Sequence, residues 1–218
     1  MINLIEGLTG AGKTWFVTRL IRYEWKNNAN CYLNYDVNFS FDNERINRWH
    51  NLDELYHLKQ AVIGIDDAQR LLNARRWFLL PVAFMELISQ HRHGGLDIYT
   101  TTQNLKDIDV YLRKNIHFRY TCQSIFRFPM NDRIKPALQL ITVAKRKRVF
   151  AQSDDTLKWE KIGKMKFYFL SRYWTKTYYD TYQDLDAQKY ESKIILKDNK
   201  WIIKMYSRDL LTRGKSRL

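Results

Sequence analysis

Short apolar runs alternate with longer amphipathic stretches over the first half of the chain. Residues 2–5 form an apolar run that predicts a buried strand, and apolar positions at helical spacing predict a helix over residues 13–26. Further apolar runs predict four more strands, at residues 31–34, 61–65, 96–102 and 116–120. Between them the pattern predicts two more helices, at residues 81–93 and 107–114. This alternation predicts an α/β fold with a mainly parallel sheet flanked by helices on both faces.

Individual residues predict where helices begin and end and which side chains of the first helix are buried. Asp53 suits the N-cap of a helix, and Pro81 suits the first turn of the helix that Gly94 and Gly95 end. The buried face of the first helix is expected to contain Trp15, Phe16, Leu20 and Tyr23.

The pattern changes at about residue 138. The following strands are expected at residues 138–143 and 166–170, with a hairpin over residues 194–205 that turns at Asp198 and Asn199. We therefore divide the chain into an α/β core at residues 1–137 and a smaller C-terminal extension with antiparallel strands at residues 138–218. The extension is expected to complete the sheet, or to contact a ligand or a neighbouring subunit.

Charge is distributed unevenly between these parts. The net charge is +14, and residues 141–218 hold 19 Lys and Arg against 9 Asp and Glu. A basic extension favours contact with a polyanion, most often nucleic acid, although a solvated basic surface is the alternative. The run Lys145-Arg146-Lys147-Arg148 suits contact with DNA phosphates, or the charged edge of a sheet.

Aromatic side chains of the extension have two interpretations: base stacking, or packing in the core or between subunits, which is favoured. They are Phe167, Tyr168, Phe169, Tyr173, Trp174, Tyr178, Tyr179 and Tyr182.

Composition excludes some classes of protein. Apolar residues make up 45% of the chain, with 8 Gly and 3 Pro, which excludes a collagen-like or largely disordered protein. The two cysteines, Cys31 and Cys122, exclude a disulfide framework. No apolar run reaches the length of a membrane span, and the first residues lack the pattern of a signal peptide, so a soluble cytoplasmic protein is expected.

One motif carries a specific chemistry. The segment between the first strand and the first helix reads Gly7-Leu8-Thr9-Gly10-Ala11-Gly12-Lys13-Thr14 and matches the phosphate-binding P-loop pattern. Its glycines let backbone N–H groups surround a phosphate at the positive end of a helix. Lys13 is expected to reach the β- and γ-phosphates of ATP, and Thr14 to bind Mg²⁺.

Two carboxylates follow the strand predicted at residues 61–65. Carboxyl ends of parallel strands form the ligand crevice of α/β sheets, so Asp66 is expected to hold Mg²⁺ and Asp67 to orient or deprotonate the attacking water. The alternative is that one of them caps the helical segment at residues 68–73.

Further candidates come from the next strand and the helices beside it. Gln103 ends that strand and is expected to sense the γ-phosphate or position water. Arg92, then Arg113, are candidates for a cation that a neighbouring subunit supplies to the transition state, and Arg75 with Arg76 are a further pair. His91 and His93 are expected to be surface residues rather than metal ligands, because their spacing puts them on different helix faces.

Together these residues resemble the FtsK–HerA superfamily of P-loop ATPases, and within it the Zot-like phage assembly ATPases and viral genome-packaging ATPases. The similar stretches are Gly7–Thr14, Val62–Ala68, His91–Asp97 and Thr101–Gln103. The resemblance implies a RecA-like core, a hexamer with ATP sites between subunits, and ATP-driven movement of DNA. Asp67 departs from the pattern, which usually has Glu.

The leading hypothesis is a motor that packages DNA into a preformed capsid and docks on a capsid vertex or a membrane protein in the host cytoplasm. Zot proteins generally carry a membrane helix after the ATPase domain, and the lack of such a segment in this sequence favours packaging. The alternatives are a Zot-like ATPase for filamentous phage extrusion, a small-molecule kinase, and a basic nucleic-acid-binding structural protein whose P-loop only binds nucleotide.

Overall fold

The computed structural model describes residues 1–37, 39, 44–75, 80–128, 138–149, 158–170, 190–197 and 200–207. The chain divides into two compact units, Met1–Gln183 and Asp184–Leu218. The second contains an antiparallel pair of strands, β9 (Tyr190–Lys197) and β10 (Lys200–Ser207), as the sequence predicts. The predicted turn at Asp198 and Asn199 lies outside the described residues.

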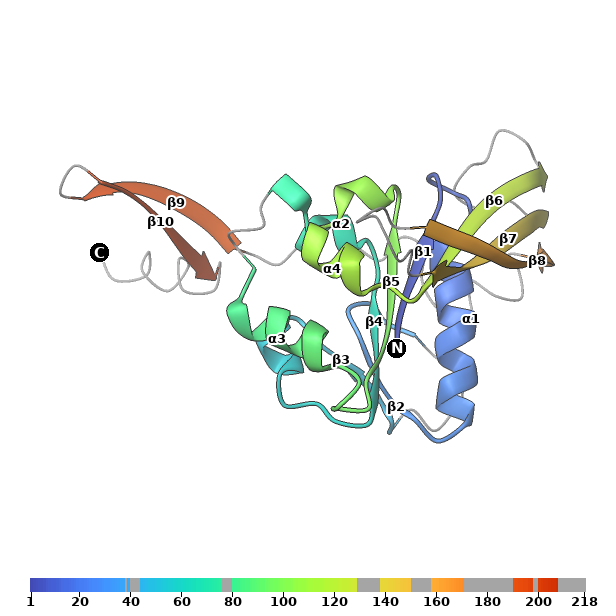
Figure 1. The fold of residues 1–218 in the computed structure, drawn as a ribbon, viewed down its shortest axis with the longest axis horizontal. Helices are drawn as coiled ribbons and strands as arrows, with labels where there is room; N and C mark the ends of the chain where they lie inside the picture. The colour runs from blue at the N-terminus through green and yellow to red at the C-terminus, as the bar shows by residue number, and fades with distance from the viewer. Residues whose placement is uncertain are drawn as a thin grey trace, which may run out of the picture. The chain divides into compact units, whose positions relative to one another are not determined.

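The first unit is built on one eight-stranded sheet in the order β3-β2-β4-β5-β1-β6-β7-β8 (Figure 1). The strands from β3 to β6 in this order are parallel, whereas β7 and β8 add to the β6 edge in antiparallel pairs. The strands are β1 (Ile2–Glu6), β2 (Asn30–Leu33), β3 (Ile46–Arg48), β4 (Ala61–Ile65), β5 (Asp97–Thr102), β6 (Phe118–Phe128), β7 (Leu138–Val149) and β8 (Lys158–Leu170).

Helices cover both faces of the parallel part (Figure 1). The long helix α1 (Lys13–Lys26) packs on one face, and α2 (Ala68–Leu71), α3 (Val82–Gln90) and α4 (Val110–Asn115) lie on the other. Short 3₁₀ helices lie in the connections, η1 (Leu52–Leu55) between β3 and β4, and η3 (Leu105–Asp107) between β5 and α4. Every residue of β1 and of β4 is buried, because strands covered on both sides have no solvent face.

The strand order identifies the fold. β5 lies between β1, which leads into the glycine-rich loop, and β4, which ends at the two aspartates. This is the arrangement of the RecA-like P-loop NTPase fold, and it confirms the predicted fold class. Among the described residues, no helix is both long enough and apolar enough to cross a bilayer.

The structure corrects some of the predicted details. β6, β7 and β8 are longer than predicted, because polar and charged residues interrupt the apolar runs that the prediction followed. The helix α3 ends at Gln90 rather than His93. Asp53 lies inside η1, whose N-cap is Asn51. Tyr23 is exposed, because the buried face of α1 passes through Ile21 and Trp25 instead.

Candidate active site

The glycine-rich loop joins β1 to α1 at the carboxyl edge of the parallel sheet. Gly10 and Gly12 have φ values of 74° and 84°, which favour glycine. A Cβ atom on Gly12 would lie 2.2 Å from Cδ1 of Ile141, so β7 leaves no space for a side chain there. The loop is also tied to β5, since the Gly7 backbone N–H donates to the Thr102 carbonyl oxygen at 3.3 Å. The loop therefore has the glycine geometry that a phosphate cradle requires.

The Lys13 side chain is buried within this loop. Its Nζ donates to the Leu8 carbonyl oxygen at 3.2 Å, and the side chain lies within electrostatic reach of Asp66 and Asp67. Burial lowers the pKa of Lys13, while the two carboxylates oppose that shift. A cation held here faces both the loop and the aspartates.

Asp66 lies at the end of β4 and is held from three sides. Its Oδ2 accepts a hydrogen bond from Thr14 Oγ1 at 2.9 Å, and its Oδ1 accepts one from Thr101 Oγ1 on β5. The Asn34 side chain bonds the Asp66 backbone N–H and carbonyl at 2.8 and 2.9 Å. Burial raises the pKa of the Asp66 carboxyl, and the two threonine hydrogen bonds oppose this.

This arrangement fits a magnesium ion. A threonine hydroxyl and a carboxylate in contact are hard oxygen ligands, and Mg²⁺ commonly takes only one or two ligands from protein and the rest from phosphates and water. Thr14 and Asp66 would therefore be its protein ligands. Among the described residues, no group of three or more His, Cys, Asp or Glu is placed to hold a metal ion.

Asp67 follows in a left-handed backbone conformation, with φ at 50°. It occupies the N-cap position of α2, as the capping alternative expects of one of the two aspartates, but its side chain makes no cap hydrogen bond. Instead, Asp67 Oδ1 accepts a hydrogen bond from Gln69 Nε2 at 3.1 Å, and the Asp67 backbone N–H donates to Thr101 Oγ1 at 2.9 Å. One threonine thus fixes both aspartates.

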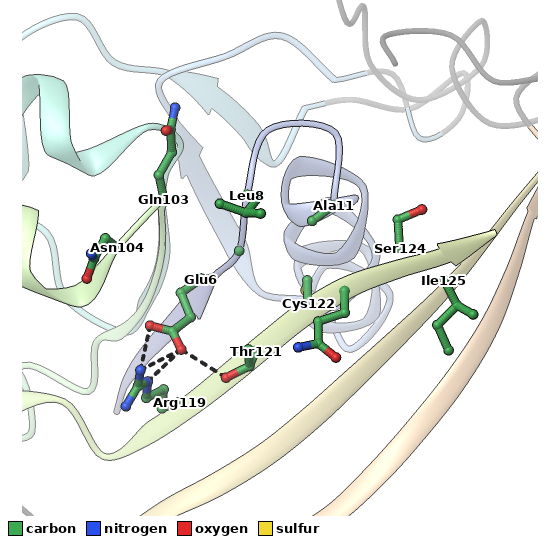
Figure 2. A pocket seen from close by; sticks show the side chains of 12 residues that line it. Glu6, Leu8, Ala11, Gln103, Asn104, Arg119, Thr121, Cys122, Ser124 and Ile125 are labelled. Atoms are coloured by element: carbon green, nitrogen blue, oxygen red, sulfur yellow. Dashed lines mark hydrogen bonds and ion pairs between the residues drawn. The ribbon is translucent and has the colours of Figure 1, made fainter. Parts of the chain in front are cut away.

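Gln103 is exposed just after β5 and lines a pocket of about 530 Å³ on the outer side of the loop (Figure 2). The other walls come from the loop, at Gly7, Leu8 and Ala11, and from β6. In Figure 2 the Gln103 side chain points away from Glu6 and Arg119 at the opposite side of the pocket. The structure brings Gln103 beside the loop but shows no contact with Lys13 or Asp67 among the described residues.

The two leading candidate arginines, Arg92 and Arg113, lie away from the loop of their own chain. Arg92 is exposed in the turn between α3 and β5, at the amino edge of the sheet, where its Nη2 bonds His117 Nε2. Arg113 is half-buried on α4. Arg75 is exposed after α2, and Arg76 falls outside the described residues. The structure therefore does not bring Arg92 or Arg113 to Lys13 within one chain.

The two histidines differ from each other. His93 is exposed as predicted, but the prediction for His91 is wrong, because that ring is buried, with Nδ1 within 2.6 Å of the Ile88 carbonyl oxygen. Phe167 packs against Trp15 and Phe16 of α1, which supports the core-packing alternative for this residue. The predicted aromatic side chains from Tyr168 onward lie outside the part of the chain whose side chains are described.

Sequence reasoning missed the residues that support the loop from β6 and β7. Gln139 Nε2 on β7 donates to the Gly10 carbonyl oxygen at 2.7 Å. Glu6, immediately before the loop, pairs with Arg119 of β6 through bonds of 2.8 and 2.9 Å and also accepts from Thr121 Oγ1 at 2.9 Å (Figure 2). Only the position of Glu6 next to the motif could have drawn attention to it.

No curated protein sequence matches the chain. Similar solved structures include the N-terminal domain of zonular occludens toxin from Neisseria meningitidis, at 18% identity over 81% of this chain and 97% of that one, with a TM-score of 0.49. Another is the genome packaging NTPase B204 from Sulfolobus turreted icosahedral virus 2, bound to ATP-gammaS, at 13% identity over 74% and 96%, with a TM-score of 0.45.

A third is the flagellar accessory protein FlaH from Methanocaldococcus jannaschii, at 12% identity over 67% of this chain and 76% of that one, with a TM-score of 0.47. The chain also matches a protein-family model, described as zonular occludens toxin (Zot), over residues 19–161. That match runs from within α1 into β8 and confirms the predicted resemblance to Zot-like proteins. The chain belongs to the Zot family.

Proposed function

We propose that this protein is an ATPase that binds Mg·ATP at the glycine-rich loop and uses hydrolysis to move DNA during virus assembly. The observation that carries the proposal is the meeting of Lys13, Thr14, Asp66 and Asp67 at one edge of the sheet. A cation, a paired hydroxyl and carboxylate, and a second carboxylate beside a phosphate cradle are the groups that phosphoryl transfer to water requires.

Each residue has one role in this proposal. The backbone N–H groups of residues 7–14 surround the β- and γ-phosphates, and Lys13 offsets their charge. Thr14 and Asp66 hold Mg²⁺, which neutralises charge on the phosphate oxygens. Asp67 orients or deprotonates the attacking water, and Gln103 responds to the γ-phosphate from the end of β5.

The proposal includes a homo-oligomer, a hexamer by family resemblance. Arg92 and Arg113 do not reach the loop of their own chain, so either would act on the loop of a neighbour. Mixing two inactive variants tests this. If Arg92 acts across an interface, Lys13→Ala and Arg92→Ala regain part of the ATPase rate when mixed, because some interfaces then contain both native residues. Lys13→Ala with Arg113→Ala tests the second candidate in the same way.

Because the chain belongs to the Zot family, the first candidate role is an assembly ATPase for phage extrusion. The second candidate is a motor that packages DNA into a preformed capsid. In either role the protein would act in the host cytoplasm, docked on a membrane protein or a capsid vertex. The type of DNA separates the two, since extrusion handles a single strand and packaging into an icosahedral capsid a duplex.

The test is the ATPase rate with and without single- and double-stranded DNA, for the wild type and Lys13→Ala. We expect hydrolysis that DNA accelerates and that Lys13→Ala abolishes. Lys106→Ala is the matched control, since Lys106 is an exposed lysine outside the site. Nucleotide binding without hydrolysis, at concentrations where the protein assembles and with every DNA tested, would instead support a structural nucleic-acid-binding protein.

A further inference from the structure

The three strands at the β6 edge carry a concentrated positive charge. In β6, β7 and β8 together, ten residues are Lys or Arg and one, Glu160, is acidic. Like charges at this density repel one another, so an uncompensated cluster destabilises the fold unless an anion binds it. This density of positive charge therefore favours an anionic ligand on these strands over a cluster that only increases solubility.

Strand register divides these cations between the two faces of the sheet, because successive side chains point to opposite faces. Lys145 belongs to the face that packs on α1, since it pairs in register with Tyr120, whose ring lies 5.5 Å from that of Phe16 in α1. Its neighbours Arg146 and Arg148 therefore lie on the opposite face, and Arg146 pairs in register with Lys161 of β8.

The same register adds two more lysines to that opposite face. Lys164 pairs with Ala144, and Lys166 pairs with Thr142, on the face of Arg146. We define the basic face as Arg146, Arg148, Lys161, Lys164 and Lys166. Its three lysines are exposed and its two arginines are half-buried. Glu160, the acidic residue of these strands, pairs with Lys147 and lies on the other face.

The basic face is connected to the candidate active site. Arg146 Nη1 donates to Thr121 Oγ1 at 3.2 Å, and Thr121 Oγ1 donates to Glu6 at 2.9 Å. Arg119, on the same face of β6, is neutralised by its pairing with Glu6 and stacks near Trp159. Glu6 directly precedes Gly7, so a few contacts separate an anion on this face from the loop.

We propose that the basic face binds the phosphodiester backbone of the DNA that the motor moves, with no base-specific contact. This rests on the proposed function and names the surface through which the DNA is held. Three exposed lysines along β8, beside two arginines of β7 and with no acid among these five residues, suit a backbone of regularly spaced phosphates. DNA bound at Arg146 would influence the glycine-rich loop through the hydrogen bonds from Arg146 to Thr121 and from Thr121 to Glu6.

The test compares two triple variants that remove the same charge. The first is Lys161→Gln, Lys164→Gln and Lys166→Gln, on the basic face. The matched control is Lys26→Gln, Lys147→Gln and Lys158→Gln, which are exposed lysines away from it. Binding of a fluorescein-labelled oligonucleotide of about 30 nucleotides, single-stranded or as a duplex, is measured by anisotropy over a range of salt concentrations.

We expect the first variant to bind the DNA at least about tenfold more weakly than the wild type. The slope of log K against log salt should also be smaller by about 2, since each lost phosphate contact reduces that slope by about 0.7 to 0.9. The control is expected to keep the wild-type slope. The inference is wrong if both variants lose the same DNA affinity or if neither loses any. In either case, DNA binding by the wild type would leave the proposed function intact. A wild type that neither binds DNA nor hydrolyses ATP faster with it would overturn the proposed function as well.

Discussion

The ion pair between Glu6 and Arg119 is expected to contribute unequally to stability, depending on which partner is removed. The Glu6 side chain is 9% exposed and the Arg119 side chain 23%. Arg119→Met leaves a buried carboxylate that keeps its hydrogen bond from Thr121, and removing one partner of such a pair costs about 3 to 5 kcal/mol. Glu6→Gln keeps one acceptor and leaves a guanidinium that water reaches, so its cost is about 1 to 2 kcal/mol.

The double variant, Glu6→Gln with Arg119→Met, completes the cycle. Because the amide that replaces the Glu6 carboxylate carries no charge, the loss of Arg119 no longer leaves a buried charge without its partner. The double variant is therefore expected to lose clearly less stability than the two single variants added together, with a coupling energy of about 1.5 kcal/mol or more. Urea unfolding of all four proteins, monitored by tryptophan fluorescence, measures each free energy of unfolding.

Two results would refute this reasoning. If Glu6→Gln costs as much as Arg119→Met, the difference in solvent exposure does not decide the cost. If the two single losses add up to the loss in the double variant, the side chains do not interact in solution. Lys106→Met, on the exposed surface beyond β5, is the control for introducing methionine and is expected to change stability by less than about 0.5 kcal/mol.

Three further predictions concern the loop and the aspartate beside it. Gly12→Ala places a Cβ in a backbone conformation that disfavours it and 2.2 Å from Ile141 Cδ1, so it should cost about 1 to 3 kcal/mol in urea unfolding; an unchanged midpoint would contradict the geometry. Gln139→Leu leaves the Gly10 carbonyl without this donor and should weaken ATP binding about tenfold, measured by calorimetry, whereas equal affinity would show that the bond does not hold the loop. Burial raises the pKa of Asp66, so its contribution to the stability of the metal-free protein should be fully present below the usual carboxyl pKa and be lost as the pH rises through the raised value. Thermal unfolding in EDTA from about pH 4 to about pH 8 measures this loss, which Asp66→Asn should remove; the same decline in both proteins would assign it to another group.

The parallel part of the fold was predictable because its strands are buried on both faces. Such strands appear in the sequence as short apolar runs, so β1 and β4 were found within a residue of their ends. The strands β6 to β8 were underestimated for the opposite reason. Charged residues interrupt their apolar positions, singly along β8 and as the run Lys145–Arg148 in β7, so apolar runs cannot delimit these strands.

The site was predictable only where a local motif defines it. The glycine-rich loop and the two aspartates each occupy a few consecutive residues, so their chemistry can be inferred from residue types and spacing. The residues that hold the loop and Asp66 in place could not be predicted in this way. Asn34, Thr101 and Gln139 reach the site from other strands or strand ends, and their hydrogen-bond partners are distant in the sequence. Tertiary contacts of this kind leave no periodic signal in the chain.

The packing of β7 on the glycine-rich loop affects how this chain can be divided. Ile141 fills the space beside Gly12, and Gln139 bonds the carbonyl of Gly10, so the loop takes its shape partly from a strand more than a hundred residues away. A fragment that stops after β6 would contain the whole P-loop motif and both aspartates but lack these two supports. The smallest autonomous nucleotide-binding fragment of this protein should therefore reach at least to the end of β7, and the loop and this strand are expected to evolve as one unit.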